Sequence, residues 1–325
     1  PVTIADVSAA AERIRGLADR TPLLENPWLD AATGGRVLIK PECLQRTGSF
    51  KIRGASNRLA RLSESERAAG VVAFSSGNHA QGVAAAAKRL KISATIVMPE
   101  DAPRLKLENT RAFGARVVTY DRQAESREEM ARRIAEETGA VLIPSYDDSD
   151  IMAGQGTVGL EIAAQAAEIG AQPDYALFPV GGGGLISGSA AALRARFPEI
   201  AVIGVEPEGF DDTARSLAAG HPVSNAPAAD SICDALLAPT PGRLTFAAMQ
   251  AAGVRGLVVD DAEVAHAMRF AFERLKLVVE PGGAVALAAL LSRRLNIEGR
   301  TAAITLSGGN VDPGRFCALM GQGSA

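Results

Sequence analysis

The chain has 325 residues, of which 47% are hydrophobic and 22% charged, and its formal net charge is −3. This length allows one large or two modest domains with a substantial core, and the charge excludes the strongly basic surface of a nucleic-acid binder. No apolar run approaches the roughly 18 residues of a membrane span, and no signal peptide is visible. The widely spaced Cys43, Cys233 and Cys317 indicate reduced thiols in a cytoplasmic protein.

Short β-branched runs alternate with longer helical patterns along the chain. The predicted strands cover residues 37–40, 71–74, 94–98, 116–120, 141–143, 175–179, 201–205, 257–259 and 303–306. The predicted helices include residues 81–90, 125–137, 187–196 and 262–275. This alternation favours an α/β fold with right-handed crossovers and a mainly parallel sheet. The strands read as continuous apolar runs, as expected for sheets covered by helices on both faces.

The segment 70–143 contains a complete series of alternating strands and helices. We interpret it as a small domain inserted into a large domain formed by residues 1–69 and 144–325. Ligands of open α/β sheets bind beyond the carboxyl ends of the strands. The loops that follow the predicted strands are therefore the first candidates for a site.

Four successive glycines, Gly181, Gly182, Gly183 and Gly184, follow the predicted strand 175–179. Without Cβ atoms, such a loop can direct several backbone N–H groups at one point. The helix that follows adds its positive N-terminal end, so the loop predicts a phosphate cradle rather than a plain tight turn. It lacks the Lys-Ser/Thr ending of a P-loop and the position of a dinucleotide fingerprint.

A second loop, after the predicted strand 71–74, contains Ser75, Ser76, Gly77, Asn78 and His79. Its place at a helix start suits a substrate carboxylate, and an ordinary N-cap explains it equally well. Lys51 lies in an apolar and aromatic context after Phe50. Burial can make such an amine nucleophilic, although a single lysine is more often a solvated helix residue.

Four motifs in this order resemble one known family. They are the run Ser49, Phe50, Lys51, Ile52, Arg53 and Gly54, the loop from Ser75 to His79, the four glycines, and the run Ser307, Gly308, Gly309 and Asn310. The chain from about Thr21 to Asp312 resembles the fold-type II pyridoxal-phosphate (PLP) enzymes, and within them the serine/threonine dehydratase and serine racemase group. The resemblance implies two open twisted, mainly parallel sheets flanked by helices, as in the tryptophan synthase β-like fold.

The resemblance also implies roles for single residues. Lys51 would bind PLP covalently and later act as the catalytic base at the substrate α-carbon. Phe50 would cover the pyridine ring, Asn78 would bond the ring oxygen O3′, and Ser307 would bond the pyridine nitrogen. The phosphate would be bound by Gly181, Gly182, Gly183 and Gly184. The substrate would be bound by Ser75, Ser76, Asn78, His79 and Arg127.

A loop after the predicted strand 201–205 resembles the divalent-metal loop of the serine racemase branch. Glu206 and Asp212 would bind through their carboxylates, and Phe210 through its backbone carbonyl. Hard oxygen ligands suit Mg²⁺, with Ca²⁺ or Mn²⁺ as alternatives. The other interpretation of this loop is an acidic solvated turn.

Two residues leave the substrate and the reaction open. In serine racemases a serine at the position of Ser76 acts as the acid or base opposite the lysine, so racemisation remains an alternative. Asp234 would repel a substrate side-chain carboxylate unless it is paired, with Arg127 as the candidate partner, or it could indicate an amine-bearing substrate. Arg127 could equally be a helix-surface residue.

The sequence therefore predicts a PLP-dependent ammonia-lyase that dehydrates a β-hydroxy amino acid, by default L-serine or L-threonine. The alternatives are a serine racemase, a threo-3-hydroxyaspartate dehydratase, and a non-catalytic ligand-binding relative, against which Lys51 argues. The expected partners are a small amino-acid substrate and a second copy of the chain in a homodimer, with no nucleic acid and no membrane.

Overall fold

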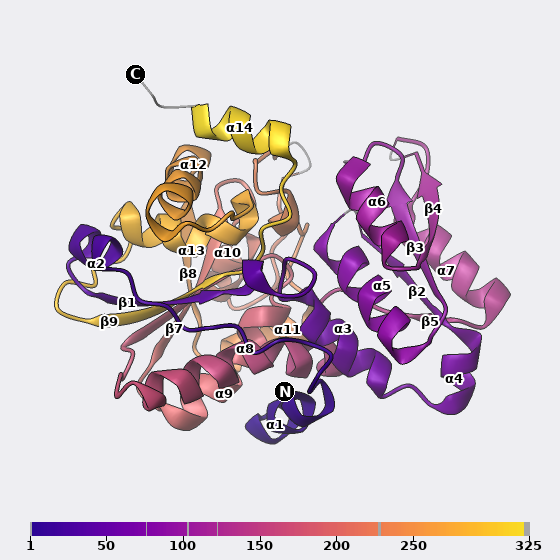
Figure 1. Ribbon diagram of the computed structural model, residues 1–325, viewed down its shortest axis with the longest axis horizontal. Coiled ribbons are helices and arrows are strands. Elements are labelled where there is room, and N and C mark those ends of the chain that lie inside the picture. The colour runs from indigo at the N-terminus through magenta and orange to yellow at the C-terminus, as the bar shows by residue number, and fades with distance from the viewer. Residues whose placement is uncertain (1, 76, 103, 122, 227–228, 322–325) are drawn as a thin grey trace.

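The computed structural model describes residues 2–75, 77–102, 104–121, 123–226 and 229–321. Its strands form two parallel sheets flanked by helices (Figure 1). The five-stranded sheet has the order β1-β9-β6-β7-β8, and the four-stranded sheet has the order β4-β3-β2-β5. The predicted α/β class with two mainly parallel sheets is confirmed.

The nine predicted strands are all present, and their ends differ from the prediction by at most two residues. The strands are β1 (Arg36–Pro41), β2 (Val71–Phe74), β3 (Ala94–Pro99), β4 (Arg116–Tyr120), β5 (Val141–Leu142), β6 (Tyr175–Pro179), β7 (Ala201–Pro207), β8 (Arg255–Val259) and β9 (Thr301–Leu306). The four strands of the smaller sheet fall within the segment 70–143 that the sequence singles out.

Helices cover both sheets. They are α1 (Ile4–Arg13), α2 (Pro27–Thr33), α3 (Lys51–Ala60), α4 (Glu64–Ala69), α5 (Asn78–Leu90), α6 (Arg104–Ala112), α7 (Arg127–Thr138), α8 (Ser149–Glu168), α9 (Gly184–Arg196), α10 (Asp212–Ala219), α11 (Arg243–Ala251), α12 (Asp261–Phe270), α13 (Pro281–Leu291) and α14 (Pro313–Gly321). Three short helical turns, η1 (Glu42–Leu44), η2 (Asp234–Leu236) and η3 (Ala271–Leu275), join them.

Local signals explain several helix ends. The predicted helix 125–137 is α7, which begins after Ser126, whose hydroxyl accepts the Glu129 N–H, and ends at Gly139 in the left-handed region. The predicted helix 262–275 is present as α12 followed by η3. Its last five residues form a π-helical turn, in which Phe272 packs edge-on against Phe316.

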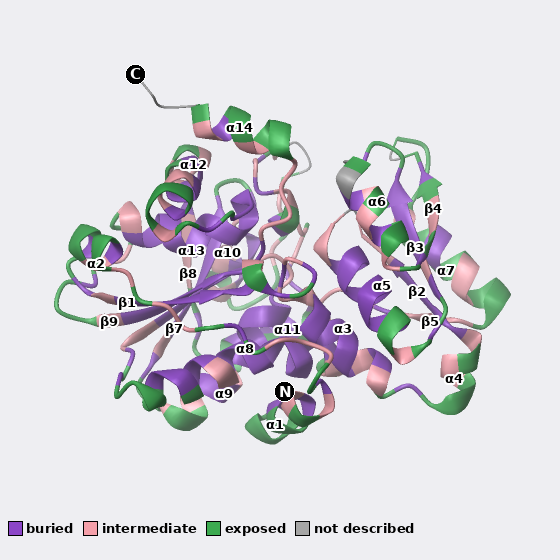
Figure 2. Ribbon diagram, in the orientation of Figure 1, coloured by how far each residue is buried: buried purple, intermediate pink, exposed green. Residues whose placement is uncertain are grey.

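The core of the larger sheet follows from the strand period of two. On β6, Ala176 and Phe178 pack towards α8 and α9, whereas Leu177 packs on the opposite face with α12 and α13. α13 is apolar nearly all round and fully buried for ten of its eleven residues, so it lies inside the molecule (Figure 2).

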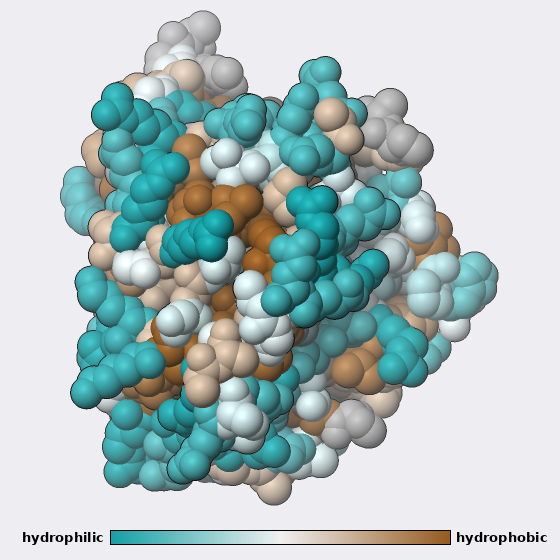
Figure 3. Space-filling model, turned by 90° about the vertical axis from the view of Figure 1, so that its right-hand side faces the viewer, coloured by the Kyte–Doolittle hydropathy of each residue, from teal (hydrophilic) through white to brown (hydrophobic). Residues whose placement is uncertain are grey.

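The smaller sheet is covered in the same way. On β2, Ala73 packs towards α3 and α5, and Val72 packs towards α7. Seen from the side of the smaller sheet, the surface is mostly hydrophilic, with apolar patches between the hydrophilic side chains (Figure 3). In the part of the chain that the structure describes, no helix combines the length and apolar character needed to cross a membrane.

The helix α3 lies between the two sheets (Figure 1). Its Ala55 and Leu59 belong to the apolar cluster of the smaller sheet, and its Arg53 bonds Glu42 beside the larger sheet. Lys51 is the first residue of this helix, so it sits where the two layers meet.

Candidate active site

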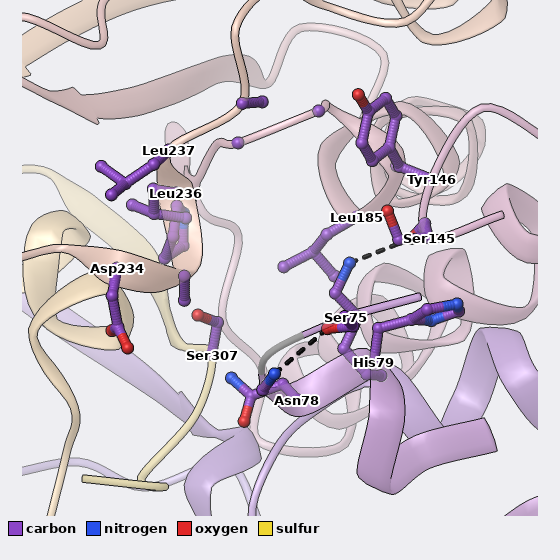
Figure 4. A pocket seen from close by; sticks show the side chains of 18 of the residues that line it. Ser75, Asn78, His79, Ser145, Tyr146, Leu185, Asp234, Leu236, Leu237 and Ser307 are labelled. Atoms are coloured by element: carbon purple, nitrogen blue, oxygen red, sulfur yellow. Dashed lines mark hydrogen bonds between the residues drawn. The ribbon is translucent and has the colours of Figure 1, made fainter. Parts of the chain in front are cut away.

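A cavity of about 170 Å³ lies between the two sheets, at the carboxyl ends of strands from both of them. It brings together nearly all the predicted PLP and substrate residues, namely Phe50, Lys51, Ser75, Asn78, His79, Arg127, Gly181, Gly182, Gly183, Gly184 and Ser307. Figure 4 shows Asp234 and Ser307 on one side of it, and Ser145 and Tyr146 on the other. Ser76, the predicted second catalytic residue, lies outside the described residues.

Lys51 directs its amine into this cavity. Its Nζ donates a hydrogen bond to the Ser145 carbonyl at 2.9 Å and lies 5.2 Å from the centre of the Phe50 ring. Burial lowers the pKa of the Lys51 amine to about 8. At pH 7 about a tenth of this amine is therefore uncharged and can attack an aldehyde.

The four glycines follow β6, open α9 and line the same cavity as Lys51. Gly183 has a φ of +89° and precedes α9 without any side-chain cap, so the first N–H groups of that helix are free to bind an anion. A Cβ on Gly182 would come within 2.3 Å of the Tyr146 ring, and a Cβ on Gly184 within 2.4 Å of Gln155 Oε1. The loop is therefore shaped for backbone groups, and it fits the phosphate of PLP.

Replacing Gly182 with alanine is expected to weaken PLP binding by about tenfold to a hundredfold, because the Tyr146 ring must move away from the new methyl group. PLP titration followed by visible absorbance would measure this loss. Gly181→Ala is the matched control, since its Cβ would lie 3.3 Å from the Leu236 Cα, and a smaller loss is expected. Equal losses would contradict this account of the loop.

The loop before α5 has a similar character. Gly77 is the N-cap residue and provides no side-chain cap, so the helix start is open to a carboxylate. His79 is buried, with its Nε2 3.1 Å from the Ile143 carbonyl. Burial, together with the charge of Lys51, lowers the pKa of His79 to about 3. His79 is thus neutral and donates its Nε2–H to that carbonyl.

The Asn78 amide is held by two residues, Glu280 and Asn310, for which no role was predicted. Its Nδ2 donates to Glu280 Oε1 at 2.5 Å, and its Oδ1 accepts from Asn310 Nδ2 at 2.8 Å. Glu280 is buried, and burial raises its pKa to about 7. One Asn78 N–H remains for a ligand oxygen, which fits the expected contact with O3′ of PLP.

The predicted pairing of Asp234 with Arg127 is wrong. Asp234 Oδ2 accepts from Lys106 Nζ at 2.8 Å, whereas Arg127 bonds Glu128 on its own helix and lies over the Phe74 ring. Lys106 comes from α6, far from Asp234 in sequence, so no local spacing could indicate this contact. The pair leaves no unbalanced carboxylate that would call for an amine-bearing substrate.

The residues of the predicted metal loop lie outside this cavity. Glu206 ends up beside Asp212, and both carboxylates are buried. Glu206 accepts the N–H groups of Thr213 and Ala214, and Asp212 Oδ1 accepts from Asn225, but Asp212 Oδ2 has no partner among the described residues. Burial raises the pKa of Glu206 to about 8 and that of Asp212 to about 6. Two buried carboxylates with an unpartnered oxygen fit a divalent cation.

The fold, the glycine cradle and the buried lysine define an enzyme of the PLP-binding class. A family model described as "Pyridoxal-phosphate dependent enzyme" matches residues 14–308, and the chain belongs to this family. It is 48% identical to an L-threo-3-hydroxyaspartate ammonia-lyase of a Pseudomonas species over 316 residues, which cover 97% of each chain.

Two further relatives support the same assignment. The chain is 41% identical to an L-threonine ammonia-lyase of Thermotoga maritima, over 99% of this chain and 79% of the relative. The solved structure of maize serine racemase superposes with a TM-score of 0.92 and 41% identity, over 98% of this chain and 97% of that one. These relatives confirm the predicted fold-type II architecture and the predicted group of dehydratases and racemases.

Proposed function

We propose that this protein is a PLP-dependent ammonia-lyase acting on a β-hydroxy amino acid, with L-serine and L-threonine as the first candidates. Water would be eliminated from the substrate, and hydrolysis of the released product, which takes one water up again, would yield a 2-oxo acid and ammonia. The observation that carries the proposal is the placement of the buried Lys51 amine in one cavity with the uncapped glycine loop. The names of the ammonia-lyase relatives support the same reaction type.

We propose a separate role for each group of residues in the cavity. When bound, PLP withdraws electrons from the substrate α-carbon. We propose that Lys51 holds the cofactor and, when free, moves the proton at that carbon. The glycine loop would bind the phosphate, Phe50 and Ser307 would orient the ring, and the open start of α5 would bind the substrate carboxylate through Ser75, Ser76, Asn78 and His79.

The lowered pKa of Lys51 gives a pH prediction. Only the neutral amine attacks an aldehyde, so the rate of PLP capture by cofactor-free protein is expected to rise with pH up to about 8 and then level off. Stopped-flow absorbance would follow this reaction. Free Nα-acetyl-lysine is the control, and its rate should go on rising towards its ordinary pKa of about 10.4. A protein profile that matches the free amino acid would contradict the proposed activation by burial.

A substrate panel tests the function. The PLP-loaded protein would be incubated with L-serine, D-serine, L-threonine and L-threo-3-hydroxyaspartate, and the 2-oxo acid, the ammonia and the opposite enantiomer would be measured. Equal amounts of 2-oxo acid and ammonia are expected from a β-hydroxy amino acid. Abundant opposite enantiomer with little 2-oxo acid would instead support racemisation, for which Ser76 is the candidate second base.

Hydroxyaspartate dehydration is the second candidate. Besides Lys51, two cations, Lys106 and Arg127, line the cavity and can attract a substrate carboxylate, and two relatives carry the name L-threo-3-hydroxyaspartate ammonia-lyase. A much higher kcat/KM for this substrate than for L-serine would establish it.

We further propose a divalent cation, Mg²⁺ or else Ca²⁺ or Mn²⁺, bound by Glu206, Asp212 and the carbonyl of Phe210. Asp212 Oδ2 has no partner among the described residues, and Asp212 is buried beside the acid Glu206, which supports this site. Thermal unfolding with Mg²⁺ and with chelator would test it. A higher melting temperature with Mg²⁺ is expected, and Asp212→Asn should remove the difference.

The remaining expectations are proposals as well. We propose a cytoplasmic homodimer in which residues 70–143 form the small domain and residues 1–69 and 144–325 the large one. Free cysteines support a reducing compartment, and the half-exposed Trp28, Leu44 and Phe272 support an interface between copies. Sedimentation analysis would test the dimer, and a monomer at micromolar concentration would exclude it.

A further inference from the structure

Lys106 and Asp234 form an ion pair in the wall of the cavity. Lys106 lies on α6, beside the four-stranded sheet, and Asp234 begins η2, on the side of the five-stranded sheet. The Lys106 side chain is 9% exposed and that of Asp234 is 33% exposed. Because the Lys106 charge is largely removed from water, its effect on a bound ligand is screened only weakly, whereas solvent screens the partly exposed Asp234 more.

The pair lies next to the proposed substrate site. Lys106 Nζ is 3.6 Å from the place where a Cβ on Gly77 would stand, and Gly77 opens the helix that would receive the substrate α-carboxylate. Asp234 lies on the wall that also carries Leu236 and Leu237 (Figure 4). An amino acid bound at the start of α5 would therefore have its side chain close to Lys106 and Asp234.

The other charged groups at this end of the cavity are less suited than Lys106 to attract a substrate carboxylate. Arg127 is 41% exposed and already bonds Glu128, so solvent weakens its attraction for a ligand. Glu280 interacts electrostatically with both members of the pair, and its Oε1 accepts the Asn78 amide, but as an acid it cannot attract a substrate carboxylate. Lys106 is the buried cation of this wall, and Asp234 is its counter-ion.

We propose that this ion pair sets the side-chain charge specificity of the active site, with Lys106 attracting and Asp234 repelling a side-chain carboxylate of the substrate. The inference rests on the proposed function, because it assumes that an amino acid occupies the cavity. If the pair only joined the two layers, removal of either partner would weaken all ligands in the same direction. A specificity role instead predicts opposite changes.

Binding of two unreactive ligands separates these cases. L-Alanine and L-aspartate lack a β-hydroxyl group and differ by one side-chain carboxylate. Their dissociation constants would be measured by calorimetry on the PLP-loaded wild type, Lys106→Met and Asp234→Asn. Relative to alanine, aspartate is expected to bind about tenfold more weakly to Lys106→Met and about tenfold more tightly to Asp234→Asn.

Controls on the same helix keep the test specific. Arg104→Met removes an exposed cation that pairs with Glu108, and the ratio of its dissociation constants for L-aspartate and L-alanine should stay within twofold of the wild-type ratio. In the double variant Lys106→Met/Asp234→Asn this ratio should return towards the wild-type value. If one single variant does not fold, the ratio of the double variant is compared with that of the single variant that folds.

The outcomes distinguish the two proposals. Opposite shifts without any 2-oxo acid from hydroxy amino acids would support the specificity role and overturn the proposed elimination. Shifts in one direction, unchanged ratios, or no binding of either ligand would overturn the specificity role, whereas 2-oxo acid formation would still support the elimination.

Discussion

Replacing Lys51 with alanine is expected to abolish the visible absorbance of lysine-bound PLP and to lower kcat for elimination by about a hundredfold to ten-thousandfold, the range that a positioned proton-transfer group contributes. The reason is geometric. Lys51 supplies an amine whose pKa is lowered to about 8, and this amine shares the cavity with the phosphate cradle. Absorbance spectra and 2-oxo acid assays on the same samples would measure both effects.

A matched control separates loss of the amine from loss of the cavity. Lys88→Ala removes a lysine from the last turn of α5, where its Nζ bonds the Ala112 carbonyl away from the site. Its spectrum and kcat should equal those of the wild type. Unchanged absorbance in Lys51→Ala would show that another group holds PLP, and the proposed role of Lys51 would then be wrong.

The strands and the glycine loop that position the site are predicted well from the sequence, because they follow from local signals. Strands buried on both faces read as apolar runs, which is why the ends of all nine are found within two residues. The glycines of the cradle are recognisable because only glycine tolerates the approach of Tyr146 to Gly182. Resemblance to a family places Lys51, since composition alone favours a surface lysine.

The side chains that complete the site are harder to predict, because they depend on tertiary contacts. Lys106 looks like any charged residue of an amphipathic helix, and its partner Asp234 lies 128 residues further along the chain. Glu280 likewise lies 202 residues from Asn78, whose amide its carboxylate fixes. The π-helical geometry of η3 is likewise not predicted by hydrophobic periodicity, which indicates only a helix there.

Arg53→Met is expected to lower the free energy of unfolding by about 3–5 kcal/mol, the cost of leaving a buried charge without its partner. Arg53 is 1% exposed and donates to both oxygens of Glu42, at 2.7 and 2.8 Å, and to Glu161 at 2.6 Å. Glu42 is fully buried, so its carboxylate cannot turn to water. Urea unfolding followed by circular dichroism would measure the change.

The control is Arg61→Met at the end of the same helix. Arg61 is 51% exposed and pairs with Asp150 at 3.0 Å, and such exposed pairs contribute only about 0–1 kcal/mol. If both variants lost the same stability, burial would not be the cause of the large effect at Arg53.

The double variant Arg53→Met/Glu42→Leu tests whether the cost comes from the stranded charge. Replacing both partners removes the unpaired carboxylate, and Glu161 keeps its other cation, Lys40, at 2.6 Å. We therefore expect the double variant to be more stable than Arg53→Met alone, since a buried ion pair often exchanges for apolar side chains at little cost. An additive loss would mean that Arg53 stabilises the fold through the geometry of its hydrogen bonds. In that case PLP affinity should fall as well, because Arg53 lies two residues from Lys51 on α3.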